Sequence, residues 1–93
     1  MEQKFVDEWL AAREKAVRMG VRLRPMEAAV AMQQAHRCLH GHRESDGFNL
    51  LAQKGRLDLS LEALAVKNQF TALFTDEEAN NALMRLLDAG YKF

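Results

Sequence analysis

The chain has 93 residues, and its 13 lysines and arginines are balanced by 13 aspartates and glutamates. A chain of this length can hold one hydrophobic core but not two. The charge balance gives no overall attraction to nucleic acid or to an acidic membrane. A composition of 48% hydrophobic and 28% charged residues is ordinary for a globular protein. We therefore expect a single folded domain over residues 1–93.

Cysteine usage and hydropathy indicate where the protein works. The single Cys38 excludes an internal disulfide and fits a reducing compartment. The stretch 1–15 is charged and lacks the apolar run of a signal peptide. No segment approaches the roughly 20 apolar residues that a membrane span needs. The sequence predicts a cytoplasmic protein with no membrane partner.

Glycine and proline divide the chain into segments with helical periodicity. These residues disfavour helix interiors, and here they fall only at the edges of the periodic segments. They are Gly20, Pro25, Gly41, Gly47, Gly55 and Gly90. We predict an all-α fold, a compact bundle of four to five short helices. The predicted helices cover about residues 3–19, 25–40, 48–54, 60–73 with an interruption near 67–69, and 76–89.

The last predicted helix is the most completely specified. Thr75 and Glu78 have the spacing of a capping box, in which each side chain bonds the backbone amide of the other residue. One narrow apolar stripe then recurs at helical spacing, and it consists of Ala79, Ala82, Leu83, Leu86 and Leu87. Gly90 supplies the left-handed stop. Start, apolar face and end agree, so this segment predicts a helix that the others pack around.

The first predicted helix is apolar over a wider arc than a surface helix needs. A domain this small leaves little interior for all of these side chains. Tryptophan and arginine are enriched at interface hot spots. We therefore predict a protein–protein interface on this helix. Its residues are Phe5, Val6, Trp9, Leu10, Arg13 and Val17.

Burial of this face against a partner predicts a small regulatory module without catalytic activity. The partner is either a second copy, as a homodimer, or another protein, and the sequence leaves both open. A symmetric dimer is the commonest soluble assembly. For Arg13, a second interpretation is that its stem packs on apolar surface while the guanidinium reaches water.

Nucleic-acid binding is the alternative function. Ala16 and Gly20 match the Ala-x-x-x-Gly kernel of a helix-turn-helix. In that case Arg18, Arg22 and Arg24 would contact phosphates. Pro25 opposes this interpretation, because it suits the first position of the next helix and lies where a recognition helix should already be under way.

Chemistry at a site has less support in the sequence. No nucleophile motif or phosphate-binding loop is present, so we predict no catalytic residues, no cofactor and no small-molecule substrate. His36 and His40 have a spacing that suits two imidazoles on one metal. Cys38 lies on nearly the opposite side of that helix, so no third ligand is fixed and no metal is predicted. These residues identify no family.

Overall fold

The computed structural model describes residues 1–92, and no strand occurs among them. The α-helices are α1 (Glu2–Arg18), α2 (Ala31–His40), α3 (Phe48–Gln53), α4 (Leu61–Ala65) and α5 (Asp76–Asp88). Three 3-10 helices connect them: η1 (Ala28–Val30), η2 (Leu57–Leu59) and η3 (Asn68–Leu73). The predicted all-α bundle of short helices is confirmed.

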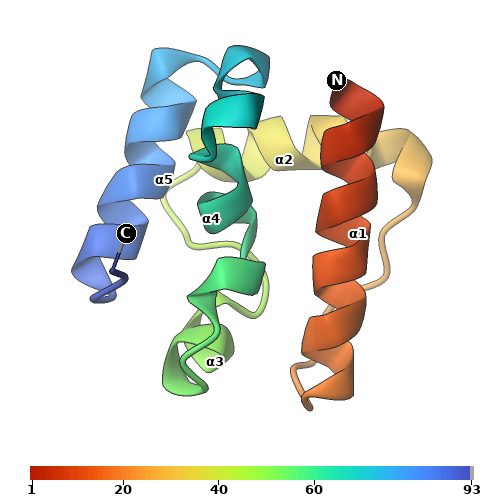
Figure 1. The fold of residues 1–93 in the computed structure, drawn as a ribbon, viewed down its shortest axis with the longest axis vertical. Coiled ribbons are helices and arrows are strands. Elements are labelled where there is room, and N and C mark those ends of the chain that lie inside the picture. The colour runs from red at the N-terminus through yellow and green to blue at the C-terminus, as the bar shows by residue number, and fades with distance from the viewer. Residues whose placement is uncertain (93) are drawn as a thin grey trace.

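The helices surround α4, the most buried element. α1 and α5 lie on opposite sides of α4, and α2 crosses behind them (Figure 1). Residues 61–65 are buried without exception, because α4 packs against α5, η2, η3 and α1. This central position explains why such a short helix is stable, since helices of this length do not persist alone in water.

Aromatic side chains from three elements form one end of the core. The Phe5 ring, which is fully buried, lies 5.2 Å from the rings of both Phe70 and Phe74 and meets each edge to face. The Trp9 ring is 6.0 Å from Phe5. Edge-to-face pairs of this kind add to the free energy gained by burial. They join α1 to η3 and to the entry of α5.

The capping box that the sequence predicts for α5 is present. Thr75 Oγ1 accepts from the Glu78 amide at 3.1 Å, and Glu78 Oε1 accepts from the Thr75 amide at 2.8 Å. Gly90 has a φ of +82°, and the Tyr91 amide donates to Leu86 O at 2.9 Å. Both ends of α5 are therefore set by local sequence.

The predicted start of the second helix at Pro25 is wrong. Residues 21–27 have no regular structure, and regular α-helix begins at Ala31 after the η1 turn. The Arg24 amide donates to Asp46 Oδ2 at 2.8 Å, and the Arg13 guanidinium donates to the Arg24 carbonyl. These contacts hold the backbone beside the 45–47 loop, so tertiary contacts override the local preference of proline.

Gly47 is required where this segment meets the loop. Its φ is +79°, and a Cβ there would lie 2.7 Å from Leu23 Cδ2 and 2.8 Å from Val21 Cγ1. Val21 is itself almost fully buried. Residues 21–23 therefore pack directly onto the glycine, and any larger residue would push the segment away.

Candidate functional site

Half of the interface predicted on the first helix is core. Phe5, Val6 and Trp9 are 0%, 6% and 6% exposed. The small domain does bury these three side chains, because α1 packs against η2, α2 and α4 together. Substituting Trp9 or Val6 would therefore disturb the core, and a loss of association in such a variant would not identify an interface.

The other three residues of that set lie at different depths. Leu10 is partly buried against the core. Arg13 lies at a cleft and holds the 21–27 segment. Val17 is 55% exposed near the end of α1. The structure does not bring the six residues together as one surface.

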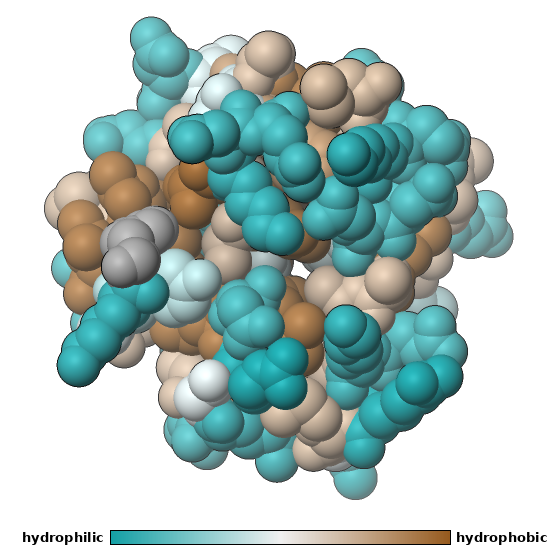
Figure 2. Space-filling view, viewed as in Figure 1, coloured by the Kyte–Doolittle hydropathy of each residue, from teal (hydrophilic) through white to brown (hydrophobic). Residues whose placement is uncertain are grey.

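A cleft of about 550 Å³ lies between α1 and the centre of the bundle, and its opening is visible between α1 and α4 in Figure 2. Its volume is in the range of small-molecule sites. Trp9 forms part of its apolar wall. Its charged residues are Arg13, Arg24, Glu27 and Asp46. Because the cleft carries two positive and two negative side chains, its charge favours neither an anionic nor a cationic ligand.

The Arg13 guanidinium does not simply reach water, as one interpretation of the sequence held. It lies 5.9 Å from the Trp9 ring centroid, within the range of a cation–π contact. Burial lowers the pKa of Arg13, and the nearby Asp46 carboxylate opposes that shift. The contact with Trp9 and the hydrogen bond to the Arg24 carbonyl make Arg13 a link between α1 and the 21–27 segment.

Two large apolar side chains of α5 are exposed, and one of them, Leu87, belongs to the apolar stripe that the sequence predicts for this helix. Met84 and Leu87 are 49% and 51% exposed, whereas Ala82 and Leu86 on the other side of the helix are fully buried. Figure 2 shows apolar surface over α5 at the left edge of the view. We call this surface the α5 outer face. It consists of the exposed residues Glu77, Asn80, Met84, Leu87 and Asp88.

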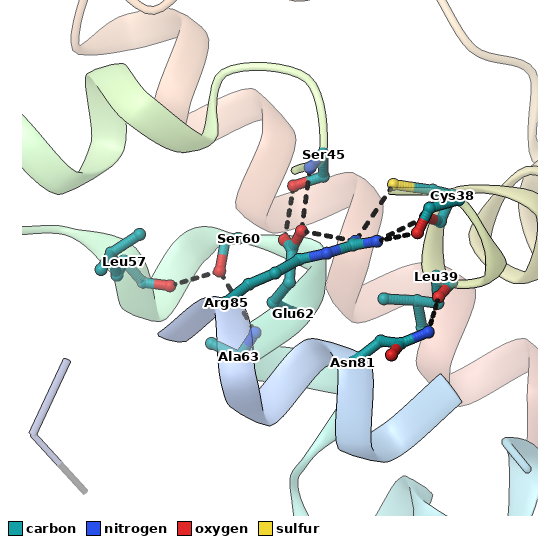
Figure 3. Close-up of polar contacts among 10 residues, drawn as sticks. Cys38, Leu39, Ser45, Leu57, Ser60, Glu62, Ala63, Asn81 and Arg85 are labelled. Atoms are coloured by element: carbon teal, nitrogen blue, oxygen red, sulfur yellow. Dashed lines mark hydrogen bonds and ion pairs between the residues drawn. The ribbon is translucent and has the colours of Figure 1, made fainter. Parts of the chain in front are cut away.

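A buried ion pair fixes which side of α5 turns inward. Arg85 Nη1 lies 3.2 Å from Glu62 Oε2, and these side chains are 11% and 0% exposed (Figure 3). Glu62 also accepts from the Ser45 amide at 2.8 Å and from Ser45 Oγ at 2.5 Å. Both carboxylate oxygens are thus satisfied, as a buried charge requires.

The same arginine and a neighbouring asparagine close the end of α2. Arg85 Nη2 donates to Cys38 O at 3.1 Å and to Gly41 O at 2.7 Å. Asn81 Nδ2 donates to Leu39 O at 2.8 Å. The last carbonyls of a helix have no partner within it. Here α5 supplies the donors, so the position of α5 depends on where α2 ends.

Cys38 lies beside this network and is not set up as a nucleophile. Burial raises the pKa of the Cys38 thiol, the Glu62 carboxylate raises it further, and Arg85 opposes both. A raised pKa keeps the thiol protonated, whereas reactive cysteines have a lowered pKa.

The two histidines that are spaced like metal ligands meet a carboxylate. His36 Nδ1 and His40 Nε2 lie 2.7 Å and 3.1 Å from the same oxygen of Glu78, which is almost fully buried. Burial alone would raise the pKa of Glu78, but the hydrogen bonds from the Thr75 amide and His36, with the histidine charges, hold it below its usual value. Within residues 1–92, no group of three or more His, Cys, Asp and Glu side chains is placed to hold a metal ion.

The arginines of the nucleic-acid alternative lie at the surface. Arg18 pairs with Glu14 at 2.8 Å. Arg22 and Arg24 line a shallow pocket of about 460 Å³ together with Arg43. The helix-turn-helix interpretation is wrong, because residues 21–27 contain no helix and a recognition helix should follow a turn of three or four residues.

Sequence reasoning missed Glu62, Arg85 and Ser45. One signal was present: Glu62 is the sole polar residue between Leu61 and Ala65, so burying that helix on all sides requires a partner for its charge. Nothing local indicates that the partner is Arg85, which lies 23 residues further along the chain.

Comparison with family models, with curated proteins and with solved structures gave no match. None of the helices within residues 1–92 has the length and apolar character to cross a membrane.

Removing one partner of the buried ion pair should strongly destabilise the fold. We expect Arg85→Met to lower the free energy of unfolding by about 3–5 kcal/mol, because Glu62 would stay buried without its counter-charge. The double variant Glu62→Met/Arg85→Met should cost less than the two single variants added together. Urea unfolding followed by circular dichroism measures both.

The exposed pair Arg18–Glu14 is the matched control. Arg18→Met should change the free energy of unfolding by less than about 1 kcal/mol, because exposed ion pairs contribute little. Equal effects at Arg18 and Arg85, or strictly additive costs at Glu62 and Arg85, would contradict the role given to the buried pair.

Because of the Glu78 carboxylate, the free energy of unfolding should depend on pH in the acid range. Its folded pKa is lowered, so its contribution is present above the unfolded pKa of about 4.3 and is lost as the pH falls through the folded value. Glu78→Gln should cost about 1–3 kcal/mol at pH 7. The difference from wild type should shrink as the pH is lowered from 5 to 2.5.

The exposed neighbour Glu77 provides the control for this titration. Its side chain is 73% exposed and lies outside the capping box. Glu77→Gln should leave the pH profile of unfolding close to wild type. A Glu78→Gln difference that stays constant over the same pH range would show that the carboxylate charge is not what stabilises this junction.

Proposed function

We propose that the protein is a non-catalytic helical module that binds a protein partner, either a second copy or another protein, through the α5 outer face. The observation that carries the proposal is the exposure of Met84 and Leu87, at 49% and 51%, on a helix whose opposite side is fully buried. Scattered exposed apolar residues are normal on a surface. Two large ones three residues apart form a continuous strip on one helix face.

The chemistry of this strip suits recognition of a protein. Methionine is flexible and polarisable, and it is enriched at the centres of interfaces. The strip is also held in a fixed orientation, because Arg85 and Asn81 attach the other side of α5 to the end of α2. A surface that is rigid before binding loses less entropy when a partner docks.

This proposal moves the interaction surface from α1 to α5. The apolar residues of α1 that motivated the original prediction are mostly committed to the core. Val17 is the exception, at 55% exposed, and it lies alone among charged neighbours. It therefore serves as a control of equal exposure on a different element.

The test compares Met84→Ser/Leu87→Ser with Val17→Ser. Wild-type protein should associate, either with itself in light scattering across concentrations or with a partner retained from the lysate of the cells that make it. The α5 double variant should lose that association by at least about tenfold in affinity. Val17→Ser should behave as wild type.

Thermal unfolding of each variant shows whether the fold is intact, and serine at these exposed positions should leave it so. Association that survives the α5 double variant, or that is lost equally in Val17→Ser, would exclude the α5 outer face as the binding surface.

Nucleic-acid binding stays the second candidate, because Arg22, Arg24 and Arg43 surround one shallow pocket. Glu44 and Asp46 line the same pocket and reduce its positive charge. In this case, binding to a DNA or RNA duplex should fall steeply with salt concentration. It should also disappear in an Arg18→Ala/Arg22→Ala/Arg24→Ala variant. Binding that is absent at low salt would remove the candidate.

A further inference from the structure

The exposed charged residues of α5 itself are all acidic. Asp76 and Glu77 lie at the amino end of α5, and Asp88 ends the helix. All three are exposed, and Glu77 Oε2 lies 3.7 Å from His40 Nδ1. The sole arginine of α5 is turned inward to Glu62, so it adds no positive charge to this surface. Lys92, beyond the end of the helix, is exposed and offsets one carboxylate.

We propose that the partner of the α5 outer face is a basic amphipathic helix of another protein. This inference rests on the proposed function and names the chemistry of the partner. The apolar strip would take the apolar side of such a helix, while lysines or arginines beside that strip would meet the carboxylates at both ends of α5. Charge complementarity of this kind sets orientation and excludes wrong partners.

The dimensions of α5 limit the length of the partner helix. A helix of 13 residues is about 20 Å long at a rise of 1.5 Å per residue. The two exposed apolar side chains occupy its carboxyl-terminal half. A partner helix of about four turns therefore spans both the apolar strip and the acidic amino end. Recognition of an amphipathic helix by a few apolar anchors is a recurring mode of binding.

A second copy of this chain fits the same surface poorly. Pairing α5 with itself in parallel places Glu77 against Glu77, and antiparallel pairing brings Glu77 toward Asp88. Parallel pairing puts like charges together at the edge of the interface, and antiparallel pairing does so at Glu77 and Asp88, where Lys92 offsets one of the carboxylates. On this face, charge therefore favours another protein over a second copy as the occupant.

The probe is a synthetic helix-forming peptide of 14 residues with leucines on one side and lysines elsewhere. Its control carries glutamate in place of every lysine. Fluorescence anisotropy of the labelled peptides, at near-physiological salt, measures binding to the full-length protein. The lysine peptide should bind and the glutamate peptide should not.

Variants of the protein then identify the surface. Met84→Ser/Leu87→Ser should weaken binding of the lysine peptide by about tenfold or more. Glu77→Gln/Asp88→Asn should weaken it by roughly two- to fivefold for each charge removed. Val17→Ser, on α1, should leave it unchanged.

Several outcomes would overturn the inference. They are no binding of the lysine peptide, equal binding of both peptides, and binding that the Met84/Leu87 variant leaves intact. Light scattering gives a separate result: a wild-type oligomer that dissociates in the Met84/Leu87 variant would make a second copy the occupant. That result would overturn the basic-helix inference and leave the proposed function standing. Only association independent of α5 would defeat both.

Discussion

Arg85 reaches from α5 into the interior, where it meets Glu62 on α4 and the last carbonyls of α2 (Figure 3). The rest of the structure depends on this arrangement. A buried carboxylate is tolerated only with a counter-charge and full hydrogen bonding, and Glu62 has both through Arg85 and Ser45. One cluster therefore connects α2, the loop that carries Ser45, α4 and α5.

The consequence for function is the orientation of α5. Because Arg85 points inward, Leu86 beside it is fully buried and Leu87, one residue later, is 51% exposed. Rotation of α5 by a single residue would break the Arg85–Glu62 ion pair and would bury Leu87 in place of Leu86. The α5 outer face is thus a product of the interior polar cluster. A second cluster at the other end of α5, formed by Glu78 with His36 and His40, holds the same orientation.

Features fixed by neighbouring residues could be predicted from the sequence. The capping box at Thr75 and the stop at Gly90 depend on residues within one helical turn, and both are present. The predicted helix start at Pro25 was wrong, because contacts with Asp46 and Gly47 hold residues 21–27 in an irregular conformation. The burial of α1 could not be predicted for a related reason. Whether Trp9 lies in the core or at the surface depends on how many elements pack around it. The Glu62–Arg85 pair was beyond prediction, because its partners are distant in the sequence.

Arg85 and Leu86 face the interior of the bundle, whereas Met84 and Leu87 face solvent. Side-chain methyl NMR with a soluble paramagnetic agent tests this arrangement most directly, because attenuation reports the solvent exposure of each methyl group. We expect strong attenuation at Met84 and Leu87, whereas Leu86, Leu39 and Leu61 should be protected because they are fully buried. Attenuation of Leu86 equal to that of Leu87, or protection of Met84 and Leu87 in the free protein, would contradict this arrangement.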